Sequence, residues 1–200
     1  MTTSFGVTYD YRCPFARIVH ENITAALRAG ADWDVDFLPF SLSQIHVEEG
    51  QTPVWEDPSK APELLALEAS LLVADTCPDR FLDVHDGLFS ARHDHSRDLR
   101  KRDVVLDVLQ TGGVDTAKIA PLLDSGVKRE ELRKLHEDAV ASHQVFGVPT
   151  FIVGPGAVFV RLMDRPNGNA ELARATIQKV LGLITDHPEI NEFKHTTIPL

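Results

Sequence analysis

The sequence predicts a mixed α/β protein in which two small groups of strands flank a long helical segment. Three observations lead to this prediction: a strand–helix–strand pattern near the N-terminus, a middle region with helical periodicity only, and a strand–strand–helix pattern near the C-terminus. The chain has 200 residues, of which 43% are hydrophobic, which suits one compact domain or a core domain with one large insertion.

The N-terminal pattern begins at residues 5–9, where large and small side chains alternate as in a short buried strand. From residue 14 to residue 29 apolar side chains recur at helical spacing, and Gly30 ends the run. Residues 33–40, WDVDFLPF, alternate again and predict a second strand. The short crossover between the two strands favours parallel neighbours.

The middle of the chain, residues 61–145, contains no convincing strand and at least four amphipathic helical patterns. Prolines near their starts and glycines near their ends punctuate these patterns as helix boundaries should. The patterns lie at residues 62–75, 78–93, 97–113 and 127–145.

The C-terminal region returns to strands at residues 149–154 and 157–163. The Gly154-Pro155-Gly156 reversal between them predicts an antiparallel hairpin. A final helix is expected over residues 167–184, with Asn167 or Asn169 as its N-cap.

Composition excludes several classes of partner. The formal net charge is −10, whereas a nucleic-acid or anionic membrane surface requires a basic patch. No apolar run approaches the roughly 18 residues of a spanning helix, and the N-terminus lacks the pattern of a signal peptide. Two cysteines suit thiol chemistry in a reducing compartment. We therefore expect a cytoplasmic protein with no nucleic-acid partner and no membrane partner.

Cys13 lies where the first helix should begin, in the stretch RCPF. Unpaired backbone N–H groups and the helix dipole favour an anion at this position, which can lower a thiol pKa from about 8.5 to roughly 3.5–7.5. Arg12 adds a neighbouring cation, and Pro14 suits the first helical position. We therefore expect a reactive thiolate, the alternative being a buried cysteine that packs as a small hydrophobe.

Pro149 stands immediately before a strand-like run, in VFGVPTFIV. A cis peptide bond can be held at such a place, and Val148 would then offer backbone N–H and C=O groups to an extended substrate. The alternative is an ordinary trans proline in a loop.

These two signals together resemble the thioredoxin-fold proteins of the DsbA family. The resemblance rests on CPF after the first strand, a large helical insertion, and GVPTF opening a β-β-α unit, and it covers nearly the whole chain. It implies a thioredoxin fold (β-α-β … β-β-α) with a large all-helical insertion. Residues 1–41 and 146–200 would form the thioredoxin-like domain, and residues 42–145 the helical insertion domain.

The resemblance also implies roles for individual residues. Cys13 would be the nucleophile, and Pro149 would be the cis proline that faces it. The related kappa-class glutathione transferases and 2-hydroxychromene-2-carboxylate isomerases carry serine at the cysteine's position. The candidate substrate-binding residues are Tyr11, Arg12, Pro14, Phe15, Val148 and Pro149.

The sequence departs from the dithiol members of the family, because Ala16 stands where they carry a second cysteine. An alanine cannot resolve a mixed disulfide, so a thiol-disulfide oxidoreductase of the monothiol kind is expected. Its substrate would be a small thiol or a protein thiol, and glutathione or mycothiol would serve as co-substrate, with no tightly bound cofactor. Cys77, in the insertion, is a candidate second thiol, although an incidental role for it is favoured.

Two other functions remain open. One is a transferase or isomerase that depends on a small thiol, and the other is a non-catalytic module that binds a peptide beside the proline. No metal is expected, because the spacing of His93 and His95 in ARHDHSRD matches no common zinc site. The oligomeric state is not fixed, and a homodimer is left open.

Overall fold

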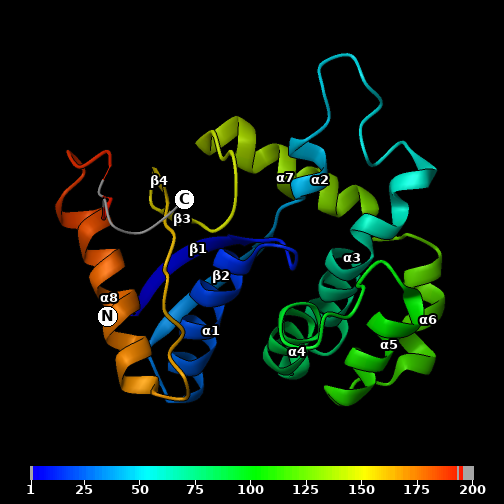
Figure 1. Ribbon diagram of the computed structural model, residues 1–200, viewed down its shortest axis with the longest axis horizontal. Coiled ribbons are helices and arrows are strands. Elements are labelled where there is room, and N and C mark those ends of the chain that lie inside the picture. Colours follow the sequence, from blue (N-terminus) through cyan, green and yellow to red (C-terminus); the bar gives the residue numbers. More distant parts are fainter. Residues whose placement is uncertain (1, 193, 196–200) are drawn as a thin grey trace.

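The computed structural model describes residues 2–192, 194 and 195. Its centre is a four-stranded sheet built from β1 (Thr3–Tyr9), β2 (Trp33–Pro39), β3 (Thr150–Val153) and β4 (Gly156–Phe159). The strand order is β2-β1-β3-β4 (Figure 1). β1 runs parallel to β2 and antiparallel to β3, and β3 and β4 form an antiparallel hairpin. The predicted β-α-β and β-β-α units are therefore confirmed.

Two long helices pack against one face of this sheet. α1 (Pro14–Arg28) connects β1 with β2, and α8 (Ala170–Asp186) follows β4. They lie against each other on the left side of Figure 1. Asn169 caps α8, because its side-chain oxygen accepts the N–H of Leu172 at 2.9 Å. The buried side chains between the two helices and the sheet are Phe5, Val7, Val19, Ile23, Phe151, Ile177, Val180 and Leu181.

The segment between β2 and β3 is helical and gathers beside the sheet (cyan to green in Figure 1). α7 returns from this group to contact β2. The helices are α2 (Leu42–Ile45), α3 (Ala61–Thr76), α4 (Phe81–His93), α5 (Arg102–Thr111), α6 (Thr116–Asp124) and α7 (Arg129–His143), with 3₁₀ turns at Pro58–Lys60 and Pro78–Arg80.

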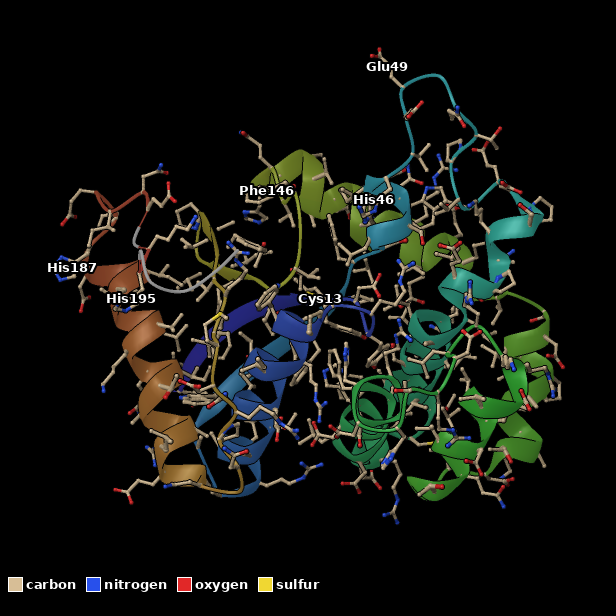
Figure 2. The ribbon with its side chains drawn as sticks, viewed as in Figure 1. Cys13, His46, Glu49, Phe146, His187 and His195 are labelled. Carbon is tan, nitrogen blue, oxygen red and sulfur yellow. The ribbon has the colours of Figure 1, made fainter. Side chains whose placement is uncertain are left out.

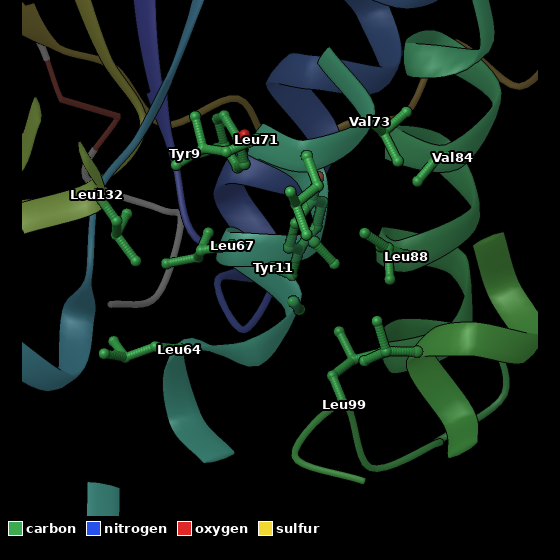
Figure 3. Packing of buried hydrophobic residues seen from close by; sticks show 14 of the residues in the cluster. Tyr9, Tyr11, Leu64, Leu67, Leu71, Val73, Val84, Leu88, Leu99 and Leu132 are labelled. Carbon is green, nitrogen blue, oxygen red and sulfur yellow. The ribbon is translucent and has the colours of Figure 1, made fainter. Parts of the chain in front are cut away.

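α3 is the central helix of this segment, because it packs against α4, α5, α6 and α7. Leu64, Leu67 and Leu71 of α3 point into one continuous apolar cluster, where each fully buried leucine contributes roughly 1.5–3 kcal/mol (Figure 3). Tyr11, which follows β1, reaches into the same cluster. Cys13 also belongs to it, so the sulfur lies at the junction between the sheet and the helical segment.

Ion pairs fasten α4 to α1 along their contact. Arg17 pairs with Asp94 just after the end of α4, and the Arg17 side chain is only 9% exposed. Arg28, at the other end of α1, pairs with Asp83 and Asp86. The helical segment is therefore held to the first helix by charge as well as by apolar contact.

Two helices differ from the sequence expectation. The pattern over residues 97–113 predicts a helix, but α5 begins only at Arg102, because residues before it form a turn in which Asp98 binds Arg100. α6 is not predicted at all. It contains Pro121, a residue that normally interrupts a helix, and it is capped by Asp115.

The hairpin is shorter than expected. The second strand is predicted over residues 157–163, but β4 ends at Phe159, which pairs with Thr150 at the start of β3. One further bond, from the N–H of Val160 to the carbonyl of Pro149, closes the hairpin. Pro149 itself lies just before β3 because it has no N–H to donate.

Within the part of the chain that the structure describes, none of the helices is long and apolar enough to span a bilayer.

Candidate active site around Cys13

Cys13 lies at the start of α1, close to where the sheet meets the helical segment (Figure 2). The chain turns sharply after β1, and the N–H of Cys13 donates to the carbonyl of Asp10 at 3.0 Å. Cys13 is the N-cap residue, with extended φ and ψ of −85° and 118°, and Pro14 occupies the first turn. The sequence therefore places the sulfur at a helix N-terminus, as expected.

The sulfur has two polar neighbours. Cys13 Sγ accepts the backbone N–H of Ala16 at 3.4 Å and lies 3.3 Å from the carbonyl oxygen of Val148. The peptide bond between Val148 and Pro149 is cis. A carbonyl oxygen can only accept a hydrogen, so this contact suits the protonated thiol as donor. Cys13 and the loop before β3, which are 135 residues apart in sequence, are thus in direct contact.

The expectation of a lowered thiol pKa is wrong. Burial raises the pKa of Cys13 above its ordinary value, since the residue is only 8% exposed. The N–H groups of Ala16 and Phe15 act in the opposite direction, while the carboxylate of Asp10 adds to the rise. The helix start supplies the donors that the sequence predicts, but loss of water around the sulfur outweighs them.

Arg12 does not act as the neighbouring cation that the sequence suggests. Its guanidinium contacts Asp10 at 2.9 Å and Glu63 at 3.2 Å, so its charge is already balanced by carboxylates. Instead Arg161, in the segment after β4, acts to lower the pKa of Cys13 against the larger effect of burial. Its guanidinium carbon lies 5.2 Å from the centre of the Phe15 ring. Sequence patterns carried no signal for Arg161, because it reaches the site through the hairpin.

Val148 presents one backbone group differently from the prediction. Its carbonyl is not free for a substrate, because it faces the Cys13 sulfur. The backbone N–H of Val148 has no hydrogen-bond acceptor among residues 2–192, 194 and 195. The N–H of Val148 is therefore the backbone group left without a partner in this part of the chain, although the residue as a whole is only 3% exposed.

Tyr11 is buried, so its ring is not exposed to a substrate. Its hydroxyl contacts His85 Nδ1 at 2.9 Å. A cavity of about 360 Å³ begins beside it and is bounded by α3 and by the chain after α4. The polar residues that line this cavity are Asp10, Tyr11, Arg12, Glu63, Arg92, Asp98 and Arg100.

A buried histidine pair continues from Tyr11 into the core. His85 Nε2 lies 2.9 Å from His20 Nδ1, and His20 Nε2 lies 3.2 Å from the carbonyl of Thr8. Because the carbonyl only accepts, His20 donates from Nε2, His85 donates to His20, and Tyr11 donates to His85. Burial lowers the pKa of His20 to about 3 and that of His85 well below its ordinary value, so both rings are neutral. No sequence pattern predicted this contact, because His20 and His85 are 65 residues apart.

Cys77 lies at the C-terminal end of α3 and shares a hydrogen bond with Thr76 at 3.4 Å. The opposite end of that helix, at Glu63, is the one that contacts Arg12. Both cysteines are free, so this structure contains no Cys13–Cys77 disulfide.

The two histidines at and just after the C-terminal end of α4, His93 and His95, do not assemble a metal site. His93 Nε2 donates to the carbonyl of Tyr11 at 2.9 Å and so supports the turn before Cys13. Over the described ranges, no three His, Cys, Asp or Glu side chains gather closely enough to hold a metal ion.

Comparison with solved structures gives relatives of the same fold. The isomerase acting on 2-hydroxychromene-2-carboxylate has a TM-score of 0.64 at 12% identity, covering 92% of this chain and 98% of that chain. The cytosolic disulfide reductase DsbM from Pseudomonas aeruginosa, solved with GSH, has a TM-score of 0.57 at 16% identity, covering 89% of this chain and 98% of that chain. DsbA from the same organism has a TM-score of 0.55 at 21% identity, covering 90% of this chain and 85% of that chain.

No curated protein sequence matches the chain. A family match exists nonetheless, and it extends from the middle of β1 to the segment before α8. It includes Cys13, the helical segment and the loop at Val148–Pro149, which are the features on which the resemblance rests. The chain therefore belongs to the family of the DSBA-like thioredoxin domain, which its sequence matches over residues 7–167.

Proposed function

We propose that this protein is a monothiol thiol-disulfide oxidoreductase in which Cys13 forms mixed disulfides with a small thiol or a protein thiol. The observation that carries the proposal is the contact of Cys13 Sγ with the carbonyl of Val148 at the start of α1, with Ala16 in place of a second thiol. Relatives of the same fold named as disulfide reductase or DsbA support the general chemistry.

The reaction needs two exchanges. The Cys13 thiolate attacks one sulfur of a disulfide, forms a mixed disulfide with that half, and releases the other half as a thiolate that takes up a proton. A second small thiolate then attacks the substrate sulfur of the mixed disulfide, and Cys13 leaves as thiolate. After these two exchanges the small thiol is joined by a disulfide to one half of the substrate, and the other half has been released as a thiol. In a second round Cys13 takes the small-thiol half of this mixed disulfide and releases the remaining substrate half as a thiol, and a second small thiol then frees Cys13 by forming the symmetrical small disulfide.

In this proposed scheme each group around the sulfur has a part. Ionisation of Cys13 would end its contact with the carbonyl of Val148, which leaves both backbone groups of Val148 for an extended substrate. The N–H groups of Ala16 and Phe15 would then stabilise the thiolate. We further propose the cytoplasm as the compartment and glutathione or mycothiol as co-substrate, because both cysteines are free.

Reduction of bis(2-hydroxyethyl) disulfide by glutathione tests the proposal. We expect Cys13→Ser to lose the catalysed rate, because serine cannot form the mixed disulfide, and Cys77→Ser to keep it. Full activity in Cys13→Ser would contradict the proposal.

Ala16→Cys tests the monothiol character separately. Residues 13 and 16 are one helical turn apart, within the roughly 4.4–6.8 Å between Cα atoms that a disulfide spans. We expect the mixed disulfide to accumulate in the native protein and to convert to an intramolecular disulfide in Ala16→Cys. Intact mass after acid quenching distinguishes the two. A native protein that never holds the adduct would argue against a monothiol route.

A small-thiol-dependent isomerase or transferase is the second candidate, because the isomerase relative has a TM-score of 0.64 and is covered over 98% of its length. It predicts conversion of an electrophilic substrate only when a small thiol is added, with partial activity remaining in Cys13→Ser.

A further inference from the structure

Arg161 is an exposed cation beside the candidate nucleophile. Its guanidinium carbon lies 5.2 Å from the centre of the Phe15 ring and 5.9 Å from that of Phe159. Phe15 is in the first turn of α1, two residues after Cys13. Two rings that belong to different elements therefore hold the arginine head group next to the start of the helix.

The charge of Arg161 is available, unlike that of the other arginines nearby. Arg12 is bound by Asp10 and Glu63, and Arg165, four residues beyond Arg161, pairs with Glu21. In the described part of the chain, no carboxylate forms an ion pair with Arg161.

The field of this charge reaches the sulfur. Burial raises the pKa of Cys13, and Arg161 acts against that rise. The chain as a whole carries a formal charge of −10, which disfavours the approach of any anion. A small anion that reaches Cys13 therefore lies within the field of an uncompensated cation, Arg161.

We propose that Arg161 selects which small thiol reacts at Cys13, an inference that rests on the proposed function. The small thiol carries a carboxylate, and Arg161 binds that carboxylate while the thiol's sulfur is joined to Cys13. The Phe15 and Phe159 rings fix the guanidinium, so less side-chain freedom is lost when the ion pair forms. This favours glutathione over mycothiol, because glutathione carries carboxylates whereas mycothiol, whose cysteine is linked through amides, carries none.

The step concerned is the first exchange. The Cys13 thiolate attacks one sulfur of a symmetrical small disulfide, the new S–S bond forms as the old one breaks, and the other half leaves as a thiolate. The half that stays on Cys13 places its carboxylate against Arg161. No further oxidant is needed, because the small disulfide supplies the oxidising equivalents.

The test uses the Cys77→Ser protein and three disulfides of different charge. These are 3,3′-dithiodipropionate (anionic), bis(2-hydroxyethyl) disulfide (neutral) and cystamine (cationic). The rate of adduct formation on Cys13 is followed by intact mass. Rates are compared as ratios between disulfides, because any change in the ionisation of Cys13 affects all three equally. Arg161→Met removes the charge, Arg161→Lys keeps it, and Arg174→Met removes an exposed charge from α8 as a matched control.

We expect Arg161→Met to lower the anionic-to-neutral rate ratio by about 1.5- to 5-fold, the range of an exposed ion pair, and to raise the cationic-to-neutral ratio. Arg161→Lys and Arg174→Met should keep the native ratios. An unchanged ratio in Arg161→Met, or an equal change in Arg174→Met, would overturn the inference. If no disulfide modifies Cys13, the proposed function itself fails, which is a different outcome.

Discussion

At Cys13, two physical effects oppose each other. The helix start provides N–H groups that favour a thiolate, whereas burial and the carboxylate of Asp10 favour the thiol, and burial is the larger effect. The sulfur accordingly faces the carbonyl oxygen of Val148 as a hydrogen-bond donor. Its selectivity as a nucleophile would then come from its position beside Val148 and Arg161 more than from its state of ionisation.

This balance predicts how Cys13 responds to pH. In the Cys77→Ser protein, the rate of labelling by iodoacetamide should keep rising past about pH 8.5, where a free cysteine is half ionised. The reason is that burial raises the pKa of Cys13. Labelling should disappear in Cys13→Ala. A rate that is already at its plateau at neutral pH would contradict the raised pKa.

The sequence could predict the contact between Cys13 and the loop at Val148 only through the family resemblance. Both positions have a local signal, a proline at the first position of α1 and a proline just before β3, but neither signal indicates that the two positions meet. Arg12 illustrates the opposite case. Arg12 is next to Cys13 in sequence, but its guanidinium pairs with Asp10 and with Glu63, which lies 51 residues from Arg12 in sequence. Proximity in sequence therefore pointed to Arg12 as the cation that acts on the Cys13 thiol, whereas in the structure that cation is Arg161.

At the scale of elements, α1 is buried on two sides, and only one of them follows the apolar pattern. The second side carries polar residues that contact three aspartates and one histidine on and just after α4. The residues on α1 are Arg17, His20, Thr24 and Arg28, and their partners on and after α4 are Asp83, His85, Asp86 and Asp94. Complementary charge is visible in the sequence, but which two helices face each other is set by the tertiary fold.

The Tyr11–His85–His20 chain across this interface predicts a difference between two tyrosines. Tyr11→Phe leaves a buried nitrogen of His85 without its donor and should lower the free energy of unfolding by about 1–3 kcal/mol. Tyr9→Phe removes a bond to Ser70, whose hydroxyl still donates to Leu67, and should cost only about 0.5–1.5 kcal/mol. Urea unfolding measures both. Equal losses would mean that the histidine chain adds nothing.

Other elements could be predicted because their signals are local. The hairpin follows from its glycines, and α8 from the cap at Asn169. α6 could not be predicted, because Pro121 suggests a break. It forms because Ile119 and Leu123 of the same short helix are buried beside α3 and α5.

At the scale of the whole molecule, buried histidines link stability to pH. Burial lowers the pKa of His20 to about 3, of His136 to about 4, and of His85 well below its ordinary value. In the unfolded chain these groups titrate near pH 6.5. Below that pH the unfolded chain binds protons that the folded chain does not, so stability is full above about pH 6.5 and is lost as the pH falls.

Urea unfolding at several pH values checks this link. The free energy of unfolding should fall between about pH 6.5 and pH 5, with a slope approaching about 1.4 kcal/mol per pH unit for each of the three histidines. His136→Gln should reduce the slope by about one histidine's share, because glutamine does not titrate. A stability that stays level over this range would show that these rings are not held neutral in the folded state.

The central claim is that Cys13 exchanges disulfides as the single thiol of the site. The most direct measurement is the intact mass of Cys77→Ser protein after incubation with glutathione disulfide at mildly alkaline pH. The account predicts one glutathionyl group per chain, located on Cys13, removed by excess glutathione and absent when Cys13 is replaced by serine. A Cys13 that remains unmodified by glutathione disulfide while iodoacetamide still labels it would contradict the account.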